Sequence, residues 1–145
     1  MNKINWKISM LWFWVSYFIG FAIVTVHTIG IIFMDSLDSY FPAYFKSLPF
    51  HPLYCLIIWP LFSFLYYRMA KPEKKQWKTA LSLGSSWSIL IIIFDLISWV
   101  IIPHPYVLTF KEFYFDSQPW ITMAYIAIFI SPFIGMFFYN KAKNK

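Results

Sequence analysis

Of the 145 residues in the chain, 60% are hydrophobic, 24% are aromatic and only 12% are charged, and the mean hydropathy is +0.59. These values exclude a soluble single domain and indicate an integral membrane protein. The formal charge of +6 does not indicate nucleic-acid binding, because the basic residues separate the apolar stretches instead of gathering on one solvated face.

Four apolar stretches are long enough to cross a hydrocarbon core of ~30 Å, which takes about 20 helical residues. The sequence predicts membrane-spanning helices over residues 8–34, 53–69, 79–102 and 120–139. The first stretch is too long for the apolar region of a removable signal peptide and has no small-x-small cleavage site, so we expect it to remain as an anchor. The expected fold is therefore all-α: residues 1–145 form one integral membrane four-helix bundle.

The basic residues predict how this bundle is oriented. Ten of the twelve Lys and Arg residues precede the first stretch, separate the second from the third, or follow the fourth. Short loops rich in Lys and Arg stay on the cytoplasmic side, so both termini are expected to be cytoplasmic. The ten residues are Lys3, Lys7, Arg68, Lys71, Lys74, Lys75, Lys78, Lys141, Lys143 and Lys145.

An imidazole and a carboxylate close the first apolar stretch, in "HTIGIIFMD" from His27 to Asp35. Asp35 follows Trp14 by 21 residues, or about 31 Å of helix. If Trp14 marks the inner interface, where indole rings prefer to lie, Asp35 reaches the outer edge of the membrane. It is then either a ligand-binding carboxylate or a solvated helix end.

Asp95, in "IIIFDLISWV", is the one carboxylate well inside an apolar stretch. It follows Lys78 by about 26 Å of helix and His27 follows Lys7 by about 30 Å, so the two lie at similar depth. Intramembrane carboxylates usually face the bundle interior and find a partner. A His27–Asp95 pair is therefore one interpretation, either as part of a site or as an interhelical hydrogen bond that only fixes packing.

Aromatic residues in the stretches include Trp99 and Tyr125. Most such rings are expected to face lipid or form interfacial belts. A subset turned inward beside an acidic residue would suit a cationic amphiphile or a sterol. The chain has one cysteine and no phosphate loop, nucleophile elbow or metal-ligand spacing, so we expect no catalytic residue, metal or other cofactor.

Three segments carry a resemblance to a known family. They are "HTIGIIFMD" from His27, "FPAYFKSL" from Phe41 and "ITMAYIAIFISPFIGMFF" from Ile121, which together cover about a third of the chain. In their order and spacing they are similar to the EXPERA family of four-helix membrane proteins. Within that family the chain resembles the sigma-2 receptor type, which is related to emopamil-binding sterol isomerase.

The resemblance implies a ligand cavity between the helices, where Asp35 would engage a ligand amine and His27 would add a polar contact. With Asp95, Trp99 and Tyr125, these form the expected ligand-binding set. The expected partner is a sterol-like or cationic amphiphilic lipid. A homodimer is also possible.

Two alternative functions stay open: a sterol isomerase-like enzyme, and a small membrane scaffold or immunity-type protein without a ligand. The tail "KAKNK" suits the endoplasmic reticulum of a eukaryote or a bacterial cell membrane.

Overall fold

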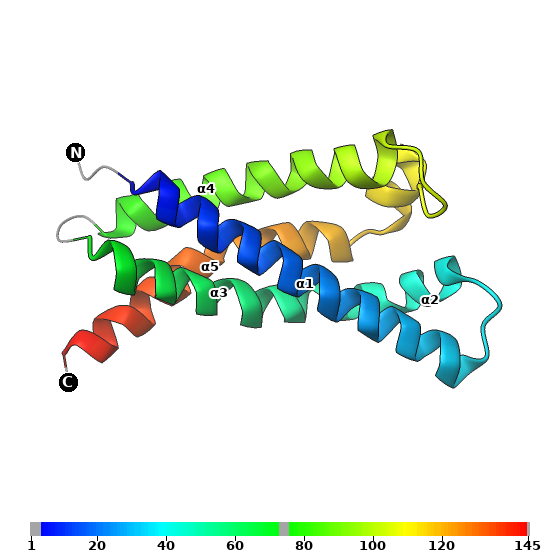
Figure 1. The fold of residues 1–145 in the computed structure, drawn as a ribbon, viewed down its shortest axis with the longest axis horizontal. Coiled ribbons are helices and arrows are strands. Elements are labelled where there is room, and N and C mark those ends of the chain that lie inside the picture. Colours follow the sequence, from blue (N-terminus) through cyan, green and yellow to red (C-terminus); the bar gives the residue numbers. More distant parts are fainter. Residues whose placement is uncertain (1–3, 73–75, 145) are drawn as a thin grey trace.

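The computed structural model describes residues 4–72 and 76–144, and within these residues it is helical and has no strand. Four long helices run side by side as a bundle (Figure 1). They are α1 (Trp6–Asp35), α3 (His51–Ala70), α4 (Gln76–Asp95) and α5 (Trp120–Lys143). The predicted all-α four-helix architecture is confirmed.

The outside of the bundle is apolar, as an integral membrane protein requires. Four helical segments are long and apolar enough to span a membrane, with mean hydropathy between 1.5 and 2.0. Large apolar side chains such as Phe18, Val26 and Ile57 are 60 to 70% exposed. Exposed apolar surface on this scale is unfavourable in water and is stable against lipid. The segments are Trp6–Asp35, Tyr40–Ala70, Gln76–Ile101 and Trp120–Lys143.

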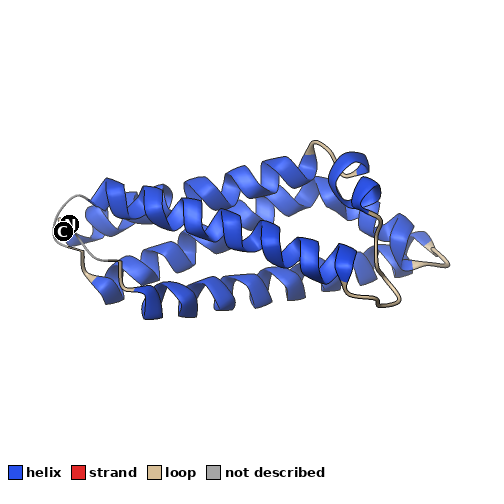
Figure 2. Cartoon of the chain, turned by 90° about the horizontal axis from the view of Figure 1, so that it is seen from above, coloured by secondary structure: helices blue, strands red, loops and turns tan. Residues whose placement is uncertain are grey.

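The helices alternate in direction, so α1 and α4 begin at the end of the bundle where α3 and α5 finish (Figures 1 and 2). The described basic residues of this end are Lys7, Arg68, Lys71, Lys78, Lys141 and Lys143, whereas Lys3, Lys74, Lys75 and Lys145 lie outside the described residues. At the opposite end, Lys46 pairs with Asp35 at 2.6 Å and Lys111 pairs with Asp116 at 2.8 Å. Positive charge is thus concentrated at one end.

The second spanning segment begins earlier than predicted. Helix α2 (Tyr40–Ser47) leads through a 3-10 turn, η1 (Leu48–Phe50), into α3. Residues before the predicted span 53–69 are therefore helical as well. Prolines often mark turns and loops. Pro42 and Pro52 instead occupy the first turns of their helices and Pro49 lies in the 3-10 turn. A proline has no N–H group to leave unpaired there, so it is tolerated.

The third spanning helix is not uniform. Helix α4 ends at Asp95 and continues as a π-helical segment, η2 (Leu96–Ile101). A second π-helical turn, η3 (Glu112–Asp116), lies in the connection to α5, which the sequence predicted as loop. Single π-turns are rare in helices and occur frequently at functional sites.

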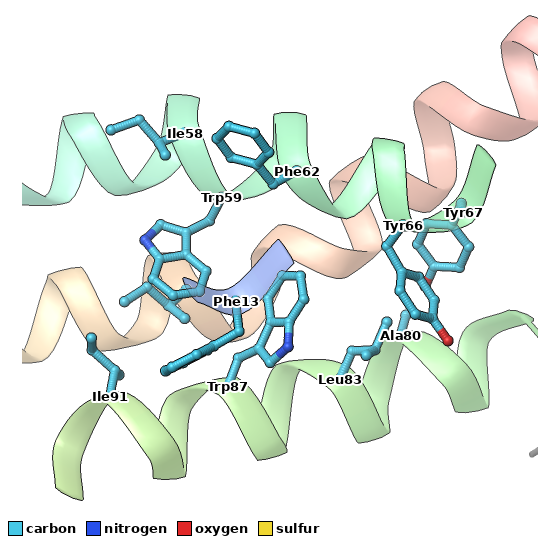
Figure 3. Packing of buried hydrophobic residues seen from close by; sticks show 11 residues of the cluster. Phe13, Ile58, Trp59, Phe62, Tyr66, Tyr67, Ala80, Leu83, Trp87 and Ile91 are labelled. Atoms are coloured by element: carbon cyan, nitrogen blue, oxygen red, sulfur yellow. The ribbon is translucent and has the colours of Figure 1, made fainter. Parts of the chain in front are cut away.

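Aromatic side chains form the core in the half of the bundle near the basic end (Figure 3). The rings of Phe13 and Trp59 lie 5.6 Å apart and those of Trp59 and Trp87 lie 5.5 Å apart. The indole Nε1 of Trp87 donates a hydrogen bond to the Ser9 hydroxyl at 3.1 Å, so its polar atom is satisfied despite full burial. A smaller outer cluster contains Tyr44, Leu48, Leu108, Phe113 and Ile121.

Candidate functional site

An internal cavity of about 120 Å³ lies where the aromatic core meets the outer cluster. All four long helices contribute to its wall, and Tyr44 from α2 and Phe113 from η3 line it as well. Most of the lining is apolar, and the cavity is partly open to the surroundings. A mostly apolar cavity with a few polar groups is typical of small-molecule sites.

Asp95 supplies a carboxyl group to the wall of this cavity. The Tyr125 hydroxyl, on α5, donates a hydrogen bond to Asp95 Oδ2 at 2.9 Å. Ile91, Asp95 and Trp99 are spaced by four residues and all line the cavity. Residues spaced by four lie on one face of a helix, so these three side chains share the face toward the cavity. The π-turn that follows Asp95 carries Trp99.

No Lys or Arg among the described lining residues neutralises this carboxylate. Asp95 is the only carboxylate among the described lining residues, and none of those residues is Lys or Arg. A carboxylate away from water is costly unless it is protonated or paired with a cation. The Tyr125 hydrogen bond offsets part of this cost but supplies no positive charge.

Aromatic rings surround the outer part of the cavity. The Tyr44 ring stacks on Trp99 with centroids 6.2 Å apart and an interplanar angle of 26°. Phe21 lies 6.2 Å from Trp99, and the His51 ring meets Tyr44 edge-on at 5.6 Å. The faces of such rings attract ammonium groups, because their quadrupole is negative above the ring plane.

Hydrogen bonds around Ser47 hold the ring of His51, the first residue of α3. The Ser47 hydroxyl donates its single proton to the Tyr44 carbonyl at 2.7 Å and accepts a bond from the Thr28 hydroxyl at 3.3 Å. His51 Nε2 lies 3.0 Å from the same Ser47 oxygen. With the Ser47 proton on the Tyr44 carbonyl, the Nε2 atom of His51 is the donor to Ser47 and Nδ1 is the acceptor nitrogen of the ring. His51 also lines the cavity.

The structure separates His27 from Asp95. His27 Nδ1 shares a hydrogen bond with the Tyr54 hydroxyl at 3.0 Å, and its ring lies edge-on against Phe50 at 4.9 Å. No hydrogen bond or ion pair of the described residues joins His27 to Asp95, and His27 does not line the cavity. The His27–Asp95 pair, one interpretation of the sequence, is therefore not formed among the described residues. Helix length gave the depth of each residue, but not the direction in which its side chain points.

Asp35 also lies apart from the cavity. It ends α1, its side chain is 43% exposed, and its carboxylate pairs with Lys46 of α2. Of the five residues expected to bind a ligand, the structure brings Asp95, Trp99 and Tyr125 to the cavity and leaves His27 and Asp35 outside its lining.

Sequence reasoning missed Tyr44, His51 and Cys55 as lining residues. On α3, His51, Cys55 and Trp59 are spaced by four residues, so they lie on one helix face. This spacing is the signal that could have identified a polar, inward-facing stripe on that helix. Nothing in the sequence indicates Tyr44, because it lies outside the predicted second span, residues 53–69.

No protein-family model, curated protein or solved structure matches the chain. The resemblance to the EXPERA family therefore stays a prediction that rests on its three segments, and what the structure establishes is a four-helix protein suited to a membrane, with an aromatic cavity around Asp95.

Proposed function

We propose that the protein binds a cationic amphiphile, with the ammonium group of the ligand beside Asp95. The observation that carries this proposal is a carboxylate in an aromatic-lined intramembrane cavity that has no Lys or Arg in its described wall. A protonated amine supplies the missing positive charge. It also gains contact with the rings of Trp99 and Tyr44, which an uncharged ligand would use less well.

The remaining polar groups support an amine that also carries a hydrogen-bond donor. The Tyr125 hydroxyl holds Asp95 Oδ2, which orients the carboxylate without occupying its other oxygen. When His51 Nε2 donates to Ser47, its Nδ1 can accept a hydrogen bond from the ligand. An ammonium or hydroxyl group of the ligand would donate to these acceptors, while its apolar part contacts the rest of the wall.

The size of the cavity favours an amphiphile over a whole sterol. Its volume of about 120 Å³ is similar to an engineered cavity of ~150 Å³ that holds benzene. A headgroup and the first part of a chain fit this space, and the rest of the ligand would leave through the open side toward lipid. A sterol-like ligand would require the helices to separate further.

The test compares two amphiphiles with the same tail, N,N-dimethyldodecylamine and dodecanol, on purified protein in a mild detergent. Asp95→Asn keeps an acceptor for Tyr125 but removes the charge. We expect the amine to bind the variant more weakly by about 1.5–3 kcal/mol, the range for a hydrogen bond to a charged group. Dodecanol should bind both proteins alike. Calorimetric titration measures both affinities.

Asp35→Asn is the matched control, because it makes the same substitution at a carboxylate outside the cavity lining. It should leave amine binding unchanged. Equal amine affinity for wild type and Asp95→Asn would contradict the proposal. Loss of binding only in Asp35→Asn would return the ligand site to the outer end of α1, as the family resemblance implies.

A further inference from the structure

A groove of about 620 Å³ runs along the outside of the bundle between α3 and α5. It is separate from the cavity around Asp95, since the two share no lining residue. Its walls are apolar except at the end near the C-terminus of α5. The main wall residues are Ile57, Leu61 and Phe64 from α3, and Ile134, Phe138 and Lys141 from α5.

The groove lies beside the closest approach of the two helices. A Cβ atom built on Gly135 would be 2.5 Å from Ser63 Cβ and 2.7 Å from the Phe64 backbone nitrogen, so only glycine fits. The larger side chains next to this contact do not fill the space between the two helices. They form the walls of the groove instead, with Leu61 53% and Phe138 52% exposed.

Positive charge gathers at one end of the groove. Lys141 lies in the last turn of α5 and lines the groove. Arg68 lies in the last turn of α3, and its guanidinium carbon is 5.8 Å from the centroid of the Phe64 ring, which is part of the wall. None of the lining residues is acidic, and both ion pairs among the described residues lie at the opposite end of the bundle.

We propose that this groove binds one anionic phospholipid, with an acyl chain along the apolar seam and the phosphate between Lys141 and Arg68. Both basic residues lie at the end of the bundle where the spanning helices meet the interface, which is the depth of a lipid phosphate. Basic pockets between membrane helices bind anionic headgroups in this way. Packing on Phe64 holds the Arg68 guanidinium close to the groove, which reduces the entropy lost on binding.

A second copy of the chain fits the groove less well. Two copies with the same orientation in a membrane would pair through a two-fold axis along the membrane normal. Lys141 and Arg68 of one copy would then approach the same residues of the other, with no carboxylate in the groove to separate them. Charge complementarity therefore favours the anionic lipid.

The experiment titrates the purified protein with dioleoyl phosphatidylglycerol or dioleoyl phosphatidylcholine and counts bound lipid by native mass spectrometry. The two lipids share acyl chains and differ in net charge. We expect the wild-type protein to bind more phosphatidylglycerol than phosphatidylcholine. Each basic residue near a membrane surface contributes a factor of about five, so Lys141→Gln should weaken phosphatidylglycerol binding about fivefold, and adding Arg68→Gln should weaken it about 25-fold. Phosphatidylcholine binding should weaken much less, because the choline ammonium offsets the charge of the same phosphate.

Lys78→Gln is the control, since Lys78 lies at the same end of the bundle, over the Trp77 ring and outside the groove. It should leave phosphatidylglycerol binding unchanged. Equal binding of the two lipids to wild type, or equal weakening by Lys78→Gln and Lys141→Gln, would overturn the proposed site. A dimer that excludes lipid and dissociates on Ile57→Lys substitution would also overturn it in favour of a second copy.

Discussion

At the scale of single residues, buried tyrosines differ in whether their hydroxyl groups have a partner. The Tyr125 hydroxyl donates to Asp95, whereas the Tyr67 hydroxyl is fully enclosed and has no hydrogen-bond partner among the described residues. The Tyr67 ring itself packs well, with Tyr139 stacked at 5.9 Å. Tyr67 therefore contributes through apolar contact and loses part of that contribution to its unpaired hydroxyl.

Removal of each hydroxyl should have opposite effects. We expect Tyr67→Phe to keep or raise the melting temperature, because it removes an unsatisfied buried group while retaining the ring. Tyr125→Phe should lower the free energy of unfolding by about 1–3 kcal/mol, since it leaves the Asp95 carboxylate without its donor. Thermal unfolding in detergent, followed by tryptophan fluorescence, measures both. A larger loss for Tyr67→Phe than for Tyr125→Phe would contradict this interpretation.

At the scale of helices, α3 and α5 form the most extensive contact of the bundle. Small residues make this contact close: Ser63 and Ser131 are fully buried, and Gly135 lies against α3. Between membrane helices apolar burial provides little driving force, so small residues that permit close van der Waals packing are favoured. The groove that we propose as a lipid site lies next to this close contact between α3 and α5.

Two glycine substitutions test this packing. Gly135→Ala should lower the free energy of unfolding by about 1–3 kcal/mol, the usual cost of overpacking, because its Cβ would overlap Ser63. Gly30→Ala is the matched control, since nothing lies within 4 Å of a Cβ built there. It should be neutral or slightly stabilising, because alanine favours helix. Equal losses in denaturant unfolding would show that α3 and α5 do not pack as described.

At the scale of the whole molecule, charge differs between the two ends of the bundle. One end carries six described basic residues, and the described carboxylates Asp35, Asp38, Glu112 and Asp116 lie at the other. Exposed ion pairs such as Lys46–Asp35 contribute little stability, but they reduce the net positive charge of that end. The distribution supports cytoplasmic termini, which remains a proposal about orientation.

Cysteine labelling tests this orientation in intact cells. In a Cys55→Ala background, Lys46→Cys should react with an impermeant thiol reagent added outside, and Lys143→Cys should react only after the membrane is permeabilised. Both positions are exposed in the structure, so access depends on the side of the membrane alone. Labelling of Lys143→Cys in intact cells would reverse the proposed topology.

The sequence predicted the four spanning helices well, because their signal is long apolar composition, which each segment carries by itself. It also pointed to Asp95, Trp99 and Tyr125, which line the cavity in the structure. A carboxylate or a ring inside an apolar stretch is recognisable from the local sequence alone. It did not predict α2 or the π-turn after Asp95. Both depend on how neighbouring segments pack against each other.

Apolar length and composition were enough to predict four membrane-spanning helices with a carboxylate inside one of them. The pairing of polar groups became visible only in the folded chain: Asp95 with Tyr125, His27 with Tyr54, and His51 with Ser47. This difference arises because composition and helix rise fix the depth of a residue along the membrane normal. The rotation of each helix about its axis, which decides which side chains share the cavity, depends on packing against every other helix.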